Sequence, residues 1–249
     1  MNSLKDKRIL ITGASSGIGR ATALLVAQQG AEVFLVARRT EKLEELQDEI
    51  AKKAHILTAD VNDPGIENKL SQFTGEKIDV LINNAGLALG RDKVETSPWT
   101  DIETMINTNI TANFRIAHAV VPWMLKNGGG DIINLCSVAG HYTYQGGAVY
   151  CATKHAVLAF TRTLREETAG RNLRVMQISP GMVDTEFSTV RFKGNSEIAD
   201  SVYKGMDPLT AEDIADMMLF MLTRPRHVVI DEIITMPMAQ GSIGTVVRK

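Results

Sequence analysis

The stretch RILITGASSGIG, residues 8–19, decides the fold. Its first five residues read as a buried strand, and residues 18–29 read as a helix that stops at Gly30. The turn between them carries glycines in the order G-x-x-x-G-x-G, not the G-x-G-x-x-G of the common Rossmann fingerprint. Glycines permit a tight turn and let the backbone approach a pyrophosphate at a helix N-terminus. Because this turn joins the first strand to the first helix, we interpret it as a dinucleotide-binding turn and not as a plain glycine-rich turn.

The rest of the chain repeats this alternation of strand and helix. Further apolar runs read as strands at residues 31–37, 55–59, 78–83, 130–136, 173–179 and 228–236. Helical runs lie between them, at residues 41–50, in a polar stretch ending near 73, and at 101–126, 148–169 and about 210–222; after Gly181 the pattern loosens until the last of these. Continuous apolar strands separated by helices indicate a parallel sheet covered on both faces. We therefore expect an α/β fold, a single doubly wound Rossmann-like domain over residues 1–249 with about seven parallel strands.

The composition excludes several classes of protein. The chain has 249 residues, of which 44% are hydrophobic and 22% charged, which is typical of a globular protein. A net charge of -2 gives no electrostatic reason to expect nucleic acid or an acidic membrane as a partner. The two cysteines form neither a disulfide framework nor a C-x-x-C metal pattern, so no metal site is predicted. The N-terminal apolar run is too short for a signal peptide and no stretch is long enough to span a membrane, so we expect a cytoplasmic protein.

Polar or glycine-containing segments directly follow five of the predicted strands. They are Thr12–Gly19, Asp60, Asn83–Gly86, Ser137 and Pro180–Gly181. In open parallel sheets, ligands bind outside the carboxyl ends of the strands. We therefore expect these five segments to converge on one crevice.

The segment SVAGHYTYQGGAVYCATK, residues 137–154, contains a serine, a tyrosine and a lysine. Tyr150 and Lys154 are four residues apart on a predicted helix, so their side chains should share one face. Acid–base work by a tyrosine at neutral pH needs its pKa to fall by about 3 units from ~10, and a nearby cation supplies energy of that order. Taken alone, the pair is more often a coincidence of helical spacing, and the other motifs decide between the two interpretations.

The second predicted strand ends in VARRTEKL, residues 36–43. NAD-selective sites usually carry an acid here to hold the ribose 2′-hydroxyl. Arg38 and Arg39 stand there instead, and a guanidinium fork suits a 2′-phosphate. An exposed arginine pair at a strand end is the plain alternative. Because the acid is also missing, NADP(H) is the favoured cofactor.

The ordered set of motifs resembles the classical short-chain dehydrogenase/reductase family over nearly the whole chain. The matching elements are Thr12-Gly13…Gly17-Ile18-Gly19, Asp60-Val61, Asn83-Asn84-Ala85-Gly86, Asn109, Ser137, Tyr150-x-x-x-Lys154 and Pro180-Gly181…Thr185. The resemblance implies that Asp60 contacts the adenine, that Asn83 and Asn84 line the cofactor channel, and that the segment after Pro180 covers the nicotinamide. The cofactor-binding set predicted in this way is Gly13, Ser15, Ser16, Gly17, Ile18, Gly19, Arg38, Arg39, Asp60, Val61, Asn83, Asn84, Ala85, Gly86, Tyr150, Lys154, Pro180, Gly181, Val183 and Thr185.

The resemblance also implies a catalytic set of four residues. Ser137 hydrogen-bonds the substrate oxygen, Tyr150 exchanges a proton with it, and Lys154 lowers the pKa of Tyr150 and binds the nicotinamide ribose. Asn109 would help to hold a water in a proton relay to the lysine. Asn109 also falls within the apolar stripe of helix 101–126, and a buried amide requires hydrogen-bond partners. The alternative for Asn109 is that it only satisfies local backbone groups.

A finer resemblance is to NADP-dependent 3-hydroxy acid dehydrogenases, which act on serine, L-allo-threonine, 3-hydroxybutyrate or 3-hydroxypropionate. It rests on NNAGLALG (83–90), Trp99, Met105-Ile106, Thr108-Asn109, YQGGAVYCATK (144–154), TEFSTVRFKG (185–194) and His227-Val228. A carboxylate favours a bidentate cation, and Arg191 is the candidate for it; pairing of Arg191 within the protein or at a subunit interface is equally compatible with the sequence. The predicted substrate-binding residues are Ser137, Gln145, Tyr150 and Arg191.

Two further expectations concern the substrate and the assembly. The segment at about 185–209 should cover the substrate, and because its part at 195–209 gives no firm match, a reductase of ketoacyl, sugar or xenobiotic carbonyls stays open. A non-catalytic dinucleotide-binding sensor is disfavoured, since a pure binder has no use for the Asn, Ser, Tyr and Lys set. Helices 101–126 and 148–169 carry more apolar surface than one sheet face requires, and the resemblance implies a homotetramer assembled through them.

Overall fold

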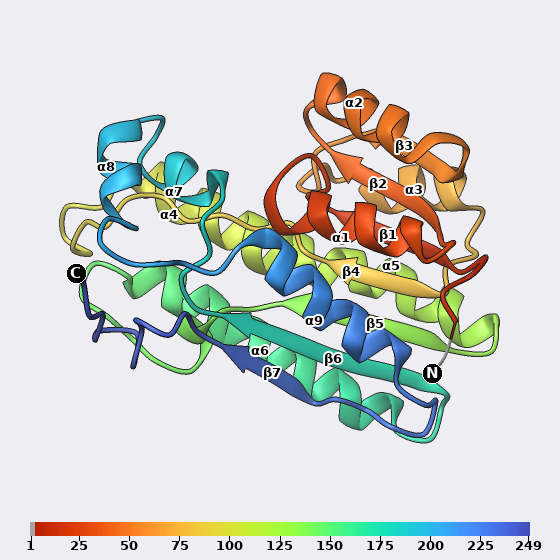
Figure 1. Cartoon of the computed structure of the whole chain (residues 1–249). Helices are drawn as coiled ribbons and strands as arrows, with labels where there is room; N and C mark the ends of the chain where they lie inside the picture. The colour runs from red at the N-terminus through yellow and green to blue at the C-terminus, as the bar shows by residue number, and fades with distance from the viewer. Residues whose placement is uncertain (1–2) are drawn as a thin grey trace.

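The protein is built on one sheet of seven parallel strands, as a computed structural model of the chain shows for residues 3–249 (Figure 1). The strands are β1 (Arg8–Thr12), β2 (Glu32–Ala37), β3 (Ala54–Thr58), β4 (Val80–Asn83), β5 (Gly130–Leu135), β6 (Leu173–Pro180) and β7 (Glu232–Thr235). Their order in the sheet is β3-β2-β1-β4-β5-β6-β7. The chain therefore leaves β1 in one direction and later returns to its other side at β4. The predicted doubly wound α/β fold is confirmed.

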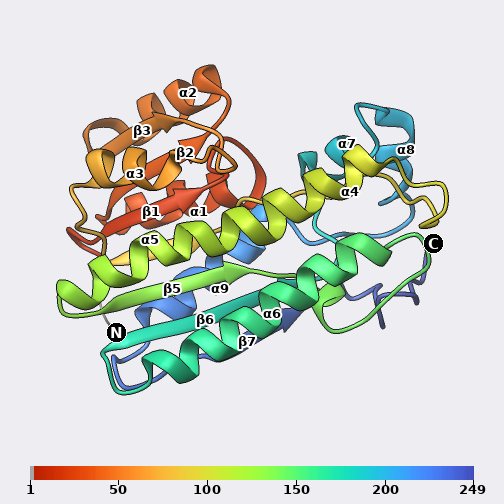
Figure 2. The ribbon, with the colours of Figure 1, turned by 180° about the vertical axis from the view of Figure 1, so that it is seen from behind.

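Helices cover both faces of this sheet. They are α1 (Gly17–Gln28), α2 (Thr40–Ile50), α3 (Ile66–Thr74), α4 (Trp99–Ile106), α5 (Asn113–Lys126), α6 (Ala148–Thr168), α7 (Glu186–Arg191), α8 (Ser196–Ser201) and α9 (Ala211–Thr223). Helices α1, α2 and α9 pack on one face, and α3, α5 and α6 pack on the other (Figure 2). No helix within residues 3–249 has the length and apolarity needed to cross a bilayer.

Each central strand contributes side chains to two hydrophobic cores, one on each face of the sheet, because successive side chains point to opposite faces. In β1, Ile9 and Ile11 join the core under α1 and α9, whereas Leu10 joins the core under α3 and α5. In β2, Leu35 and Val36 divide between the two cores in the same way. A strand buried on both faces cannot alternate apolar with polar residues, which is why these strands read as continuous apolar runs.

Three segments differ from the sequence-based prediction. The helix expected at 101–126 is interrupted, because a π-helical turn at Asn107–Ala112 separates α4 from α5. The strand expected at 228–236 is only four residues long in β7. The segment after Gly181, read from the sequence as loosely patterned, contains the short helices α7 and α8. Six-residue helices span fewer than two turns, so an apolar period has no room to show.

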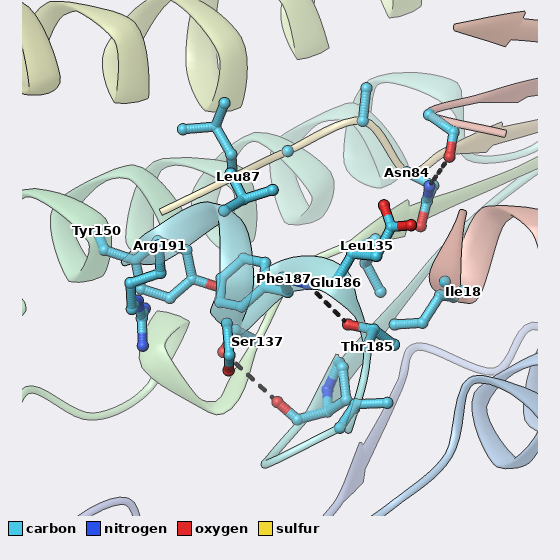
Figure 3. A pocket seen from close by; sticks show the side chains of 18 of the residues that line it. Ile18, Asn84, Leu87, Leu135, Ser137, Tyr150, Thr185, Glu186, Phe187 and Arg191 are labelled. Carbon is cyan, nitrogen blue, oxygen red and sulfur yellow. Dashed lines mark hydrogen bonds between the residues drawn. The ribbon is translucent and has the colours of Figure 1, made fainter. Parts of the chain in front are cut away.

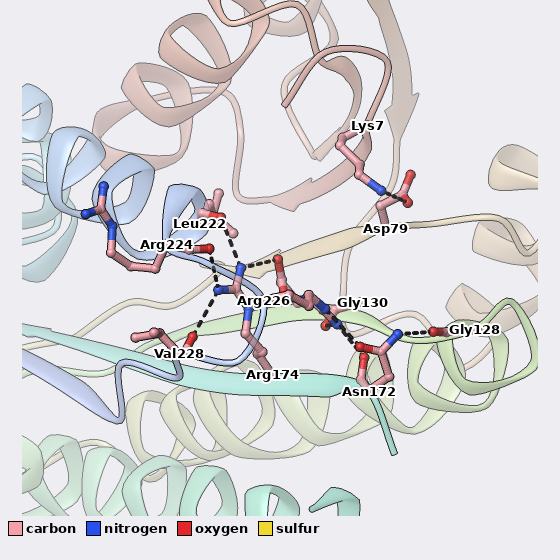
Figure 4. A network of polar contacts seen from close by, with 11 residues as sticks. Lys7, Asp79, Gly128, Gly130, Asn172, Arg174, Leu222, Arg224, Arg226 and Val228 are labelled. Carbon is pink, nitrogen blue, oxygen red and sulfur yellow. Dashed lines mark hydrogen bonds and ion pairs between the residues drawn. The ribbon is translucent and has the colours of Figure 1, made fainter. Parts of the chain in front are cut away.

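A buried ion pair fastens the end of the sheet opposite the strand carboxyl ends. Arg174 on β6 is 3% exposed and donates two hydrogen bonds of 2.7 Å to the carboxylate of Asp131 on β5. Arg174 also donates to the backbone carbonyls of Leu222 and Val228 (Figure 4). The link ties β5 and β6 to the end of α9 and leaves the carboxyl ends of the strands open for a ligand.

Candidate active site

A cavity of about 440 Å³ lies at the carboxyl ends of the strands. The predicted site residues that line it are Gly13, Ser15, Ser16, Gly17, Ile18, Arg38, Arg39, Asp60, Val61, Asn84, Ala85, Gly86, Ser137, Tyr150, Lys154, Pro180, Gly181, Val183, Thr185 and Arg191. All five strand-end segments reach it, as predicted. Gly19, Asn83, Asn109 and Gln145 stand outside its lining.

The glycine turn is fixed to the neighbouring strand by hydrogen bonds. Thr12 Oγ1 accepts from the backbone nitrogens of Asn84 and Ala85, each at 3.0 Å. The Asn84 side chain in turn donates to the carbonyl of Thr12 at 2.9 Å and to that of Gly13 at 3.3 Å, the second of which is dashed in Figure 3. Gly13 has φ +65, and a Cβ on Gly19 would collide with the carbonyl of Gly13. The turn is therefore held where only glycine fits, and its backbone faces the cavity.

Asn83 departs from its predicted place. It is 2% exposed, and its side-chain amide donates to the carbonyl of Asn113 at 2.9 Å. As the last residue of β4 it points toward α5, while Asn84 and the two residues after it reach the cavity. The expectation that Asn83 lines the channel is wrong, because the side-chain alternation along the strand turns it to the helical face.

The two arginines after β2 have different surroundings. Arg38 is exposed, and its nearest carboxylate oxygen is Oδ2 of Asp60, 4.0 Å away. Arg39 forms an ion pair of 2.8 Å with Glu186, the first residue of α7, and donates to Ser15 Oγ. Arg38 is thus the less engaged guanidinium of the pair, while Arg39 links the glycine turn to the segment that covers the cavity.

Tyr150 and Lys154 lie one turn apart on α6 and both are buried. Tyr150 is 9% exposed and Lys154 is 4% exposed. Nζ of Lys154 donates to the carbonyl of Leu135 at 3.0 Å and lies 5.9 Å from the centre of the Tyr150 ring. Ser137, 9% exposed, follows β5 and faces the same cavity. The helix therefore presents the phenol and the ammonium on one face beside the serine, as predicted.

Burial is the largest cause of the pKa shifts of Tyr150 and Lys154. It raises the pKa of Tyr150 to about 12, against the charge of Arg191 and a hydrogen bond from Ser137, which both lower it. Burial also lowers the pKa of Lys154. Both shifts disfavour the charged form of each group. The expectation that Lys154 brings down the pKa of Tyr150 is not met in this structure, where Arg191 is the strongest influence in that direction.

Asn109 lies on the π-helical turn, where it is 1% exposed. Its side-chain oxygen accepts from the backbone nitrogen of Leu87 at 2.9 Å, and its amide donates to the carbonyl of Leu87 and to Thr153 Oγ1. Asn109 thus fixes the backbone of a residue that lines the cavity, and attaches it to α6. The alternative of purely local hydrogen bonding is not what the structure shows, because the backbone groups that Asn109 satisfies belong to Leu87, 22 residues away. Its part in a proton relay stays a prediction.

Arg191, the last residue of α7, reaches the cavity beside Tyr150. Its guanidinium carbon lies 5.0 Å from the ring centres of both Tyr150 and Phe187, the residues beside it in Figure 3. Arg191 also donates to the hydroxyl of Tyr144 at 3.1 Å. Its buried Nε has no hydrogen-bond partner in the described part of the chain. The predicted Gln145 is exposed and off the cavity, and Tyr144 occupies that place instead.

Several residues that line the cavity were not among the predicted site residues. They are Arg91, Tyr144, Glu186, Phe187, Tyr203 and Gln240. Gln240 lies in the irregular C-terminal region, and its side-chain oxygen accepts from the backbone nitrogen of Met182 at 2.9 Å. Such contacts join segments far apart in the chain, so local periodicity does not reveal them. The sequence held a partial sign for four of the six, since Tyr144 lies within the quoted stretch 144–154 and the segment at about 185–209 contains Glu186, Phe187 and Tyr203.

A parallel sheet of this order, with a glycine turn after its first strand and a tyrosine and lysine beside the cleft, defines a dinucleotide-dependent oxidoreductase. The family model for short chain dehydrogenases matches residues 7–196. This chain belongs to the short-chain dehydrogenase family.

Two relatives and one solved structure match nearly the whole chain. An NADP-dependent 3-hydroxy acid dehydrogenase of Schizosaccharomyces pombe is 46% identical, over 100% of this chain and 99% of that protein. A serine 3-dehydrogenase of Agrobacterium fabrum is 41% identical, over 95% of this chain and 96% of that protein. The closed form of serine dehydrogenase complexed with NADP+ has a TM-score of 0.91 and 38% identity, over 97% of this chain and 99% of that one.

Proposed function

We propose that this protein is an NADP(H)-dependent oxidoreductase that interconverts a short 3-hydroxy acid and its carbonyl form. The observation that carries the proposal is the position of Arg191 next to Tyr150, with a buried, unpartnered Nε. A substrate whose hydroxyl lies at Tyr150 and Ser137 would bring a carboxylate to that guanidinium. The names of the two relatives, a 3-hydroxy acid dehydrogenase and a serine dehydrogenase, support the same substrate class.

The cleft has the features that NADP(H) requires. The glycine turn offers backbone for a pyrophosphate, and exposed Arg38 would bind the 2′-phosphate, since Arg39 is paired with Glu186. Asp60 and Val61 reach the same cavity, where an adenine would contact them. The relative that is named NADP-dependent and the neighbour complexed with NADP+ support this choice over NAD.

The chain's own groups handle the proton. The bound cofactor supplies the hydride donor or acceptor. For reduction, the protonated phenol of Tyr150 donates to the developing alkoxide, while Ser137 hydrogen-bonds the same oxygen. For oxidation, Tyr150 must first lose its proton; a pKa raised to about 12 opposes this at neutral pH, and the deprotonated fraction grows as the pH rises. Lys154 would bind the nicotinamide ribose through its buried ammonium, and Arg191 opposes the effect of burial on Tyr150.

We also propose that the segment at about 185–209 closes over the substrate and that the protein assembles as a homotetramer. The segment carries Phe187 and Arg191 to the cavity, and the ion pair between Glu186 and Arg39 ties it to the cofactor side. The assembly proposal rests on the family resemblance and on the apolar side chains of Trp99 and Ile106, which α4 leaves 67% and 38% exposed.

The function is tested by a panel of substrates. Reduction of NADP+ and then NAD+ is followed spectrophotometrically with L-serine, 3-hydroxybutyrate and 3-hydroxypropionate at mildly alkaline pH. We expect NADP+ to be reduced with at least one of the acids, and NAD+ much more slowly. Turnover of neutral alcohols alone would indicate a reductase of another carbonyl class. Cofactor binding without any turnover would indicate a sensor.

The Arg38→Asp variant tests the cofactor assignment. An aspartate cannot bind the 2′-phosphate and repels it, so kcat/KM for NADPH relative to NADH should fall by roughly 10- to 100-fold, as expected for loss of one charge-assisted contact. Arg171→Asp, an exposed site outside the cavity with the same change in charge, is the control. An unchanged NADPH to NADH ratio in Arg38→Asp refutes the assignment.

The Arg191→Ala variant tests the carboxylate-binding role. Loss of a partly desolvated guanidinium contact should raise KM for 3-hydroxybutyrate by at least about tenfold, and should raise KM for the neutral analogue 1,3-butanediol far less. Steady-state kinetics on both substrates measure the difference. A lysine at this position keeps the charge but loses the fork, so it should recover only part of the effect. An equal rise in KM for acid and diol would show that Arg191 acts on the fold and not on the carboxylate.

A further inference from the structure

The charged groups around the cavity separate into two regions. Beside the glycine turn and the ends of β2 and β3, positive and negative groups are mixed, namely Arg38, Arg39, Asp60 and Glu186. Around Tyr150 the charged lining residues are Arg91, Lys154 and Arg191, with no carboxylate among the described residues that line this part. One carboxylate needs one guanidinium fork. The substrate end of the cavity therefore holds one arginine more than a simple hydroxy acid uses.

Arg91 and Arg191 approach different parts of Tyr144, the ring and the hydroxyl. The guanidinium carbon of Arg91 is 5.6 Å from the centre of the Tyr144 ring, whereas Arg191 donates to the hydroxyl of the same tyrosine. Burial raises the pKa of Tyr144, and the charges of both arginines oppose that shift. Tyr144 is thus close to two cations, and all three residues line one cavity.

The position of Arg91 is defined although it lies outside regular structure. Its backbone packs directly on Gly146, where an added Cβ would collide with the carbonyl of Arg91. Gly146 has φ +77 and lies just before α6, which carries Tyr150. The loop is therefore attached to the catalytic helix, and in the described part of the chain the Arg91 guanidinium has no carboxylate within ion-pair distance.

We propose that Arg91 is a second anion-binding residue, and that the site prefers 3-hydroxy acids that carry a second carboxylate. This rests on the proposed function, because the hydroxyl is placed at Tyr150 and the first carboxylate at Arg191. The second carboxylate then lies near the Tyr144 ring, where Arg91 can bind it and the Tyr144 hydroxyl can donate a hydrogen bond. The two negative charges of such a substrate would also offset the repulsion between the guanidinium groups of Arg91 and Arg191.

A matched pair of substrates tests this proposal. 3-Hydroxybutyrate and 3-hydroxyglutarate share the hydroxyl and the first carboxylate, and only the diacid has the second one. With NADP+, the wild-type enzyme should show a lower KM for the diacid. Arg91→Gln should raise KM for the diacid by about tenfold, the size expected for one charge-assisted contact, and raise KM for the monoacid much less.

Two further variants test whether the effect of Arg91→Gln depends on the position of the lost charge. Lys93→Gln removes an equal charge from an exposed residue outside the cavity and should leave the KM ratio of the two acids as in the wild type. Arg191→Ala should raise KM for both acids. The diacid preference should also weaken with added salt, since Arg91 is exposed.

The results separate a failure of the proposed function from a failure of the Arg91 proposal. If the wild-type enzyme reduces NADP+ with neither acid, nor with L-serine or 3-hydroxypropionate, the proposed function fails, and the role of Arg91 fails with it. If it oxidises L-serine or 3-hydroxypropionate but not the diacid, only the role of Arg91 is overturned. If both acids are oxidised but the diacid is not preferred, or Arg91→Gln raises both KM values equally, only the role of Arg91 is overturned.

Discussion

The hydrogen bonds between Thr12 and Asn84 are the contacts on which the site depends. They join the carboxyl ends of β1 and β4, the strands between which the winding of the sheet reverses. In such a sheet the crevice opens at this point, because the crossovers leave it in opposite directions. Fixing the two strand ends holds the glycine turn against the cavity and sets the entry for a dinucleotide. Asn109 extends the same support, since it holds Leu87 just after β4 and contacts α6 through Thr153.

The second constraint is the burial of Tyr150 and Lys154. Removing both from water pushes the phenol toward its protonated form and the lysine toward its neutral form. The cation that most opposes this for Tyr150 is Arg191, which comes from α7 and not from α6. The acid–base strength of Tyr150 therefore depends on the position of α7, and the ion pair of Arg39 with Glu186 connects that helix to the cofactor side. Cofactor cleft and proton donor are thus physically linked.

Sequence predicted the parts of the site that depend on local pattern. The strand ends follow from continuous apolar runs, the glycine turn follows from its spacing between a strand and a helix, and the shared helical face of Tyr150 and Lys154 follows from a period of 3.6 residues. The prediction failed where long-range packing decides the outcome. Asn83 turns toward α5 and Gln145 gives way to Tyr144, because each depends on a neighbour distant in the chain. The direction of the pKa shift of Tyr150 was also missed, since burial cannot be read from spacing.

The most direct measurement is the activity of Tyr150→Phe with NADPH binding measured in parallel by fluorescence. Without the hydroxyl no proton is exchanged at the substrate oxygen, so kcat/KM should fall by at least about 10²-fold while the Kd for NADPH stays near the wild-type value. Tyr142→Phe, at an exposed tyrosine outside the cavity, serves as the control and should behave as the wild type. Near-normal turnover by Tyr150→Phe would contradict the assignment of this tyrosine as the acid–base group.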